Sequence, residues 1–364
     1  MKRLIAFSLL LCLLLCGCGN KEVAGTTGAT TTAPTETTTL PTEETTVPTK
    51  PPVLYRHPLT GEPLDQPFTG RPVAVSIGNT KAALPQHGIS EADIFFEIEA
   101  EGGITRFLPI FTDLRNVASI GPIRSARTFF NNVAAAYNAP IAHCGGSVRG
   151  IQGYYDLTGS KISSWAHIDE FTYGSKYFHR DLDRYNYQDY AWEHCLFTTG
   201  EDMMAALSAL KYQTDEAWDL GFTFTDEVAT EGENATKITV SFLGGKTSSL
   251  VYDETSGLYA ISQYDRELID GTTGQQLTFK NVLVLYADQT KKHDGSYVRS
   301  YYDLIGEGEG YFAMDGKMVK INWSREDVKK PFVYTLKDGS SLELGVGKSY
   351  IGIADPDSDP IKYE

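Results

Sequence analysis

The chain has 364 residues and carries 47 Asp and Glu against 32 Lys and Arg, which gives a formal net charge of −15 at pH 7. An acid excess of this size argues against nucleic acid as a partner and against wide contact with an anionic lipid surface. Any recognition of anions must therefore be local.

The first residues form a secretory signal. Two basic residues are followed by an apolar run from Leu4 to Cys16, which is too short for a permanent transmembrane helix. The run ends in Leu15-Cys16-Gly17-Cys18, which resembles the bacterial lipobox, whose last cysteine carries the lipid. We expect residues 1–17 to be a lipoprotein signal peptide and Cys18 to be lipidated. The alternative is a plain cleaved signal or an anchor helix, and all three place the fold outside the cytoplasm.

Residues 18–52 are rich in Thr with interspersed Pro and Glu. Such a segment lacks the apolar side chains that would offset its ordering entropy. We expect a disordered tether that lifts the folded part off the extracytoplasmic face of the bacterial cell membrane.

Residues 53–217 show alternating strand and helix patterns. The residues 71–79 read as a strand, and residues 92–111 read as two strands around the hairpin turn Gly102-Gly103. A two-residue turn places Glu99 opposite Arg106, with Glu97 and Glu101 on the same face as Arg106. Helices are expected from Ser125 as N-cap and from Thr199, which has Asp202 three residues on.

Residues 218–364 show strand patterns alone. The Asp-Gly pairs at Asp315-Gly316 and Asp338-Gly339 are typical hairpin turns. The predicted fold is therefore an α/β N-terminal domain, with a mixed sheet and flanking helices, followed by a smaller and mainly antiparallel β domain.

The stretch SIGPIRSARTFF places Arg124 and Arg127 at the start of the first expected helix. A cation there is disfavoured by roughly 0.3–1 kcal/mol, and free backbone N–H groups attract anions. One interpretation is purely structural: an ion-pair network of Glu97 and Glu101 with these arginines and Arg106. The other is functional: a pocket for phosphate, pyrophosphate or carboxylate that uses the planar guanidinium groups.

Beyond Cys12, Cys16 and Cys18, the chain has two cysteines, Cys144 and Cys195. Outside the cytoplasm such a pair is compatible with a disulfide. Each cysteine directly follows a histidine, His143 or His194. This arrangement is also compatible with a zinc site of two His and two Cys ligands. Because the chain has no close C-x-x-C or H-x-x-x-H pair, we favour a disulfide or free thiols, and we expect no metal and no cofactor.

Aromatic residues are dense from Tyr154 to Phe197. They suit either a glycan-binding surface or a loop-rich core, and we favour packing. The histidines His143, His179 and His194 are candidate general bases beside the arginines, although a structural hydrogen-bonding role is favoured for each.

The motifs RPVAVSIGN, ADIFFEIEAEGGITRF, IGPIRSAR, AHCGGS, FHRD and EHCLFT, in this order, resemble those of YerB-like bacterial lipoproteins. That family consists of paired N- and C-terminal domains of unknown function, and the resemblance covers Arg71 to the C-terminus. It implies that these positions are typical of the family: Glu97, Glu101, Arg106, Gly121, Pro122, Arg124, Ser125, Arg127, His143, Arg180, Asp181 and His194. The chain departs from the family at Cys144 and at Glu193-His194-Cys195, which favours a chain-specific disulfide over a shared metal site.

The family brings no activity with it, so the function is predicted from the residues. They predict a lipoprotein of the cell envelope that binds an anionic wall component or a protein partner through an Arg-rich cleft, without catalysis. The partner is expected to be a cell-wall glycan, a lipid-linked anionic precursor or an envelope protein, with the membrane contacted through the lipid anchor. The alternative is an enzyme on prenyl-pyrophosphate-linked wall polymers, similar to LytR-CpsA-Psr phosphotransferases. Their metal-binding aspartates have no aligned counterpart here, and arginines alone do not supply a metal site.

Overall fold

The fold is organised around one large mixed sheet. The computed structural model describes residues 54–146, 167–212, 217, 220–294 and 297–364, and within these ranges the sheet has twelve strands. Ten of them lie in this order: β12 (Glu233–Asn234), β22 (Lys317–Arg325), β21 (Gly306–Met314), β18 (Asn281–Tyr286), β25 (Ser349–Ala354), β5 (Ile94–Glu101), β6 (Ile104–Phe111), β3 (Val73–Val75), β7 (Ile141–His143) and β8 (His167–Asp169). β23 (Val333–Leu336) pairs with β22, and β4 (Ile77–Gly78) pairs with β6.

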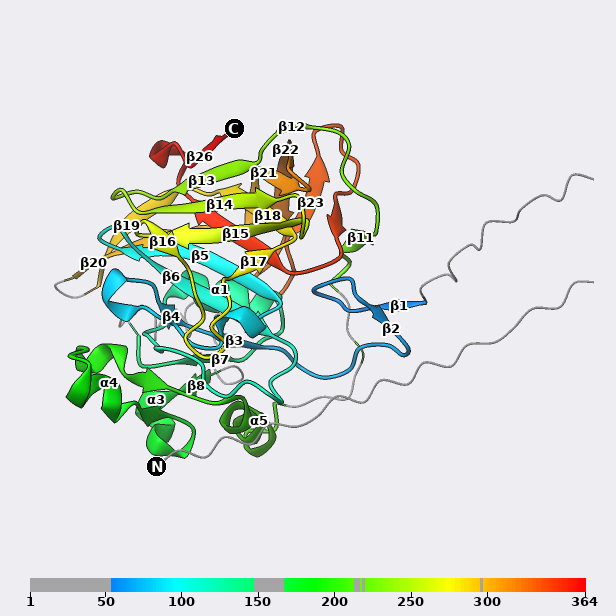
Figure 1. Ribbon diagram of the computed structural model, residues 1–364. Helices are drawn as coiled ribbons and strands as arrows, with labels where there is room; N and C mark the ends of the chain where they lie inside the picture. The colour runs from blue at the N-terminus through cyan, green and yellow to red at the C-terminus, as the bar shows by residue number, and fades with distance from the viewer. Residues whose placement is uncertain (1–53, 147–166, 213–216, 218–219, 295–296) are drawn as a thin grey trace, which may run out of the picture. The chain divides into compact units, whose positions relative to one another are not determined.

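Strands from both ends of the folded chain are neighbours in this sheet. β25 lies between β18 and β5 and is parallel to both. In Figure 1 the cyan strand β5 accordingly lies beside strands from the yellow to red part of the chain. All described residues belong to one compact unit, Pro52–Glu364.

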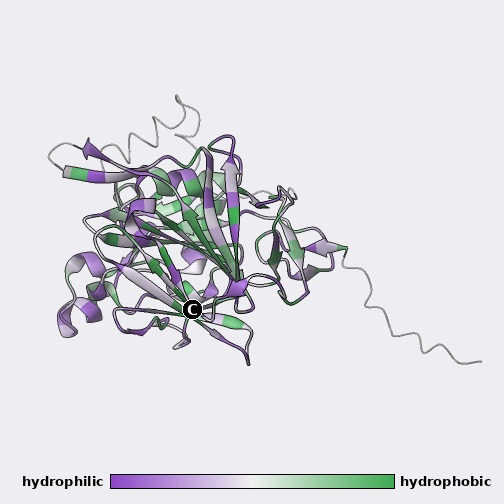
Figure 2. Ribbon diagram, turned by 90° about the horizontal axis from the view of Figure 1, so that it is seen from above, coloured by the Kyte–Doolittle hydropathy of each residue, from purple (hydrophilic) through white to green (hydrophobic). Residues whose placement is uncertain are grey.

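A second sheet covers one face of the large sheet. Its strands are β16 (Arg266–Glu267), β15 (Leu258–Gln263), β14 (Thr247–Asp253), β13 (Lys237–Ser241), β26 (Ile361–Tyr363) and β17 (Thr278–Phe279), and all their pairs are antiparallel. Phe95 and Phe107 of the large sheet share a core cluster with Leu250 and Ile261 of this second sheet. Figure 2 shows hydrophobic residues, in green, along the strands of the two sheets. Inward-facing side chains of packed sheets form the core between them.

Helix α1 (Thr128–Ala136) covers the opposite face of the large sheet. Each of its residues is buried, as expected for a helix that is apolar nearly all round. Phe129 and Phe130 share a core cluster with Phe96 and Ile110. The hairpin of β19 (Gln289–Asp294) and β20 (Tyr297–Tyr302) packs on the same side, where Tyr302 meets Phe129 edge to face at 5.3 Å.

Short elements complete the described chain. They are β1 (Tyr55–Arg56), β2 (Pro63–Leu64), β9 (His179–Arg180), β10 (Leu196–Phe197), β11 (Thr223–Thr225), β24 (Glu343–Gly345), α3 (Glu170–Tyr173), α4 (Leu182–Tyr187), α5 (Gly200–Ala209) and 3-10 turns at Lys81–Ala83, Ile89–Glu91, Gly174–Lys176, Trp192–His194 and Pro356–Ser358. No helix in the described ranges is long and apolar enough to cross a bilayer.

Local sequence signals predicted several element ends correctly. The Gly102-Gly103 turn joins β5 to β6, and Asp315-Gly316 joins β21 to β22. Thr199 caps α5 by accepting from the backbone N–H of Asp202. The predicted N-cap Ser125 is wrong, because α1 begins later and Arg127 occupies the cap position without a side-chain cap bond.

The predicted fold class agrees with the structure in its sheets more than in its helices. The large sheet is mixed and the second sheet is antiparallel. Few helices cover the large sheet: the second sheet packs on one face, and α1 packs on the other. The predicted signal peptide, the lipidated Cys18 and the tether to residue 52 lie outside the described residues.

Candidate functional site

The hairpin of β5 and β6 sets the geometry of the candidate site. Arg106 pairs with Ile98, and Glu99 pairs with Thr105, because a bulge at Ala100 shifts the register before Glu101. The predicted pairing of Glu99 with Arg106 is therefore wrong. A bulge adds one residue to one strand, and every side chain beyond it changes face relative to a regular ladder.

The bulge separates the two glutamates that the sequence placed together. Glu97 faces the second sheet and is fully buried there. Its carboxylate accepts hydrogen bonds from the following side chains: Asn79, Thr105, Ser248, Gln263 and Tyr350. Glu101 lies on the other face, with Arg106. The predicted common network of both glutamates with the arginines is therefore wrong for Glu97.

Glu101 is the centre of an arginine cluster, which we define as Arg106, Arg124, Arg127 and Arg299. The Glu101 carboxylate is 3.0 Å from Arg106 Nη2, 2.5 Å from Arg127 Nη2 and 3.1 Å from Arg299 Nη1. The buried Arg106 and Arg127 come from the two motifs EGGITR and GPIRSAR. Arg299 of β20 carries no local sequence signal and reaches the site only through the packing of the β19–β20 hairpin.

The charges in the cluster act strongly on one another. Burial alone would raise the pKa of Glu101, but Arg106, Arg127 and Arg299 hold that pKa below its usual value. Burial lowers the pKa of Arg106 well below its usual value, and the charge of Arg127 lowers it further against the opposing effect of Glu101. Arg124 and Arg299 add to the lowering. The cations of the cluster therefore repel one another, and Glu101 offsets part of this repulsion.

Arg124 lies at the edge of the cluster. Its Nη1 donates to the Glu193 carbonyl at 3.0 Å and is 3.2 Å from the Glu193 carboxylate, which is 59% exposed. His194, the next residue, is buried, and burial followed by the charge of Arg124 lowers its pKa. Ser125 contributes its backbone carbonyl, which accepts from Arg106 Nη1. The structure thus brings Arg124, Ser125 and His194 to the same edge.

His143 belongs to a neighbouring pair that the sequence did not predict. Its Nδ1 donates to the Gly145 carbonyl at 2.7 Å, so its Nε2 accepts from His167 Nδ1 at 2.8 Å. Burial lowers the pKa of His143 despite Asp169 nearby, and burial together with His143 lowers the pKa of His167 to about 2. The pair is therefore neutral, and its hydrogen bonding supports the structural interpretation of His143.

The predicted disulfide is absent, because Cys144 and Cys195 are free thiols. Cys144 Sγ donates to the Glu170 carboxylate at 3.3 Å, whereas Cys195 Sγ faces the Ala191 carbonyl at 3.5 Å. Burial and Glu170 raise the pKa of the Cys144 thiol to about 12, which makes it a poor nucleophile. No three His, Cys, Asp or Glu side chains are grouped as metal ligands in the part of the chain that the structure describes.

Arg180 and Asp181 have different roles. Asp181 caps α4 by accepting from the backbone N–H of Arg184 at 3.0 Å. Arg180 lies over the Trp192 ring at 4.6 Å and donates to the Trp192 carbonyl at 2.9 Å. Of these two predicted site residues, Asp181 is thus a structural cap, and Arg180 presents a cation beside an aromatic ring.

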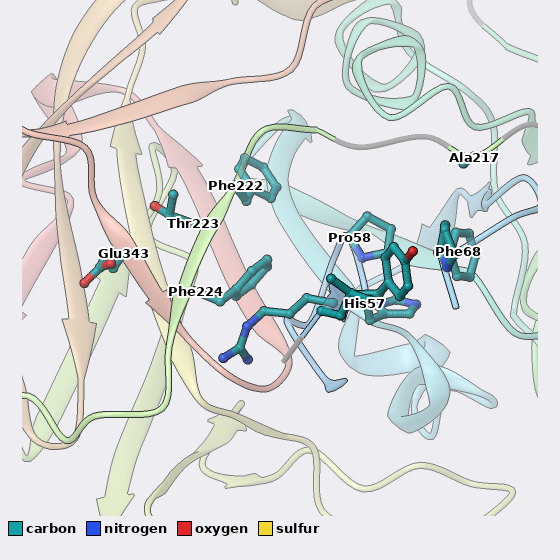
Figure 3. A pocket seen from close by; sticks show the side chains of 12 residues that line it. His57, Pro58, Phe68, Ala217, Phe222, Thr223, Phe224 and Glu343 are labelled. Carbon is teal, nitrogen blue, oxygen red and sulfur yellow. The ribbon is translucent and has the colours of Figure 1, made fainter. Parts of the chain in front are cut away.

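A separate pocket of about 540 Å³ was not predicted from the sequence. Figure 3 shows Phe222 and Phe224 projecting from the strand region of β11 toward His57, whereas Thr223 projects from the opposite face, as alternation along a strand requires. Arg56, which also lines this pocket, donates to the Asp226 carboxylate and to a backbone carbonyl. The lining of this pocket includes Tyr55, Phe68, Phe222 and Phe224, and none of the described residues that line it belongs to the arginine cluster.

Two family models match the chain in tandem. The "Protein of unknown function (DUF3048) N-terminal domain" matches residues 59–213, and the DUF3048 C-terminal domain matches residues 238–351. The chain therefore belongs to the DUF3048 family, in which two domains of this kind are paired. The predicted resemblance to YerB-like lipoproteins is confirmed at this level.

One relative is a curated protein of Bacillus subtilis (strain 168) described as "Putative lipoprotein YerB". It is 29% identical over 315 residues, which cover 83% of this chain and 86% of that protein. A crystal structure of the YerB protein from Bacillus subtilis is similar to this fold, with a TM-score of 0.71 and 26% identity over 85% of this chain and 99% of that chain. The fold described above is thus shared with a solved structure.

Proposed function

We propose that this protein is a lipid-anchored lipoprotein of the bacterial cell envelope that binds an anionic ligand through the arginine cluster. The observation that carries the proposal is the convergence of Arg106, Arg127 and Arg299 on the Glu101 carboxylate, with Arg124 at the edge. Planar guanidinium groups suit phosphate, pyrophosphate and carboxylate ligands. In a chain with net charge −15, this local concentration of cations stands out.

Arg124 is the residue that would meet the ligand first. Its side chain is partly exposed, whereas Arg106 and Arg127 are buried against Glu101. The carboxylate of Glu193 is exposed and can move into solvent, so a ligand anion would take its place beside Arg124. Binding of this kind weakens as salt screens the charges.

Thermal melting of residues 53–364 with inorganic pyrophosphate tests the proposal. The wild type is expected to melt several degrees higher with saturating pyrophosphate, because a ligand that binds the folded state stabilises it. Arg124→Ala should lose this rise while keeping its fold. The matched control is Arg115→Ala, which removes an exposed arginine that pairs with Asp113 elsewhere. An equal rise in Arg124→Ala, or none in the wild type, would contradict the proposal.

The lipid anchor is tested independently. Cys18→Ser removes the last cysteine of the lipobox, which is the one expected to carry the lipid. We expect the full-length variant to leave the membrane fraction, whereas Cys144→Ser should remain there. The sequence alternative, a phosphotransferase similar to LytR-CpsA-Psr enzymes, stays a prediction that a turnover assay with Mg²⁺ and prenyl-pyrophosphate-linked substrates would test.

A further inference from the structure

Large apolar side chains are unusually exposed between residues 171 and 192. Phe171 is 75% exposed, Tyr187 82%, Leu182 53%, Trp192 48% and Tyr185 47%. Neighbouring aromatic residues Tyr177, Phe178 and Phe197 are buried in the core instead. Packing of the fold therefore accounts for the second set, whereas the first set presents much of its apolar surface to solvent. Exposed apolar groups gathered in one region are typical of interaction sites.

Trp192 is held in a fixed position although half of it is exposed. The guanidinium of Arg180 lies over its ring, and Tyr185 meets the ring edge to face at 5.0 Å. Arg180 also bonds the Trp192 carbonyl. The indole is thus preorganised. Stacking of a ligand on it would cost little side-chain conformational entropy of the protein.

A closed series of contacts connects these rings to Arg124. On one side, Arg124 donates to the carbonyl of Glu193, which directly follows Trp192. On the other side, Cys144 donates from its backbone to the Arg124 carbonyl. The ring of Phe171 lies against the next residue, Gly145, where a Cβ would be 2.5 Å from the ring.

The series closes through Glu170. Its carboxylate is 3.9 Å from Arg180 Nη2, and it directly precedes Phe171. The contacts thus link Phe171, Arg124, Trp192 and Arg180 in this order, through the backbone at Cys144 and Gly145 and through Glu193 and Glu170. We call these four residues the patch. Each arginine has a carboxylate beside it, Glu193 for Arg124 and Glu170 for Arg180, and the carboxylate of Glu193 is the more exposed of the two.

We propose that this patch binds a phosphorylated glycan, with sugar rings stacked on Trp192 and Phe171 and a phosphate between Arg124 and Arg180. The proposal rests on the anion site proposed above and adds the sugar to its ligand. A sugar ring has apolar faces and polar edges, which match aromatic rings with polar surroundings. The alternation of rings and cations matches a ligand in which sugars and phosphates alternate, and the ligand phosphate displaces the exposed Glu193 carboxylate.

Calorimetric titration with N-acetylglucosamine 1-phosphate, inorganic phosphate and N-acetylglucosamine tests this inference on residues 53–364. The wild type should bind the sugar phosphate about tenfold more tightly than phosphate. Trp192→Ala should abolish this difference, because it removes the ring on which the sugar stacks. Trp192→Phe, which retains a ring, should restore most of the difference, and Tyr187→Ala is the control for an exposed ring outside the series of contacts.

The outcomes separate the two proposals. Equal affinities for phosphate and sugar phosphate in the wild type, with phosphate binding lost in Arg124→Ala, would overturn the glycan proposal and leave the anion site. A preference for the sugar phosphate that persists in folded Trp192→Ala would also overturn it. The absence of binding by all three probes would overturn both proposals. Circular dichroism of each variant verifies that it is folded.

Discussion

Glu97 shows how a carboxylate becomes a structural element when it is enclosed by donors. Hydrogen-bond donors from both sheets converge on it, and Lys246 Nζ lies 3.9 Å away. Burial lowers the pKa of Lys246, while Glu97 raises it. Glu97 therefore joins the large sheet to the second sheet through polar contacts inside an apolar core.

Glu97→Ala is expected to lower the free energy of unfolding by about 3–5 kcal/mol, because it leaves a buried cation and several donors unpaired. Glu97→Gln keeps one acceptor and should cost less. Urea unfolding followed by circular dichroism measures both. Glu307→Ala, at an exposed position on β21, should stay within about 0.5 kcal/mol of wild type. A similarly small effect of Glu97→Ala would contradict this role.

The pair of His143 and His167 predicts a loss of stability in mild acid. The folded state lowers the pKa of His167 to about 2, whereas the unfolded chain titrates near its usual value. The unfolded state therefore binds a proton first as the pH falls below about 6.5, so stability is full above this pH and declines below it. At pH 5, His167 alone should account for about 2 kcal/mol.

Urea unfolding at pH 7 and pH 5 measures this loss. His167→Asn, which retains a donor for His143 Nε2, should show a smaller loss between the two pH values than wild type. His293→Asn replaces an exposed histidine and should leave the loss unchanged. An undiminished loss in His167→Asn would assign the acid sensitivity to other groups.

At the scale of elements, two turns from distant parts of the chain meet backbone to backbone. Gly103 lies in the β5–β6 turn and Gly244 in the β13–β14 turn, and a Cβ on Gly244 would be 2.4 Å from the Gly103 Cα. Gly245, the next residue, has nearly the same φ, +89° against +88°, but no atom within 4 Å of its Cβ position. The adjacent glycines thus differ in contact and not in backbone conformation.

Gly245→Ala should cost about 1 kcal/mol, because it places a side chain in the left-handed region. Gly244→Ala carries the same strain and also a clash, which adds about 1–3 kcal/mol. Chemical denaturation of the two variants measures the difference directly. Equal costs would show that the two turns do not pack as closely as described.

The elements also show which features could be predicted from the sequence. Turns and caps depend on a few adjacent residues, so Gly102-Gly103 and the Thr199 cap were predicted correctly. The bulge at Ala100 has no local signal, and it decides which face Glu101 occupies. The motifs EGGITR and GPIRSAR predicted Glu101 and three of the four arginines of the cluster. Arg299 was not predicted, because it joins Glu101 only through tertiary packing.

At the scale of the whole molecule, the two regions matched by the family models share one sheet. β25, which begins at the end of the second region, pairs with β5 of the first along five residue pairs. Removing either region would expose the edge of a central strand and the apolar faces beside it. We therefore expect the two regions to depend on each other for folding.

Residues 53–364 are expected to unfold in one cooperative transition, with the same midpoint by near- and far-ultraviolet circular dichroism. The fragment of residues 53–217 should lack a cooperative transition on its own, and adding the fragment of residues 218–364 should restore one. A cooperative transition of the first fragment alone would show that β5 does not need β25.

The central claim is that Glu101 is the built-in counter-anion of an arginine cluster that also accepts an external anion. Calorimetric titration of inorganic pyrophosphate into wild type and Glu101→Gln tests this most directly. Glu101→Gln should be less stable without ligand, because its cations lose their shared charge. It should bind pyrophosphate about tenfold more tightly than wild type, since the negative charge of Glu101 no longer offsets the cations of the cluster. Unchanged or weaker binding by a folded Glu101→Gln variant would contradict the claim and leave the cluster as a structural network.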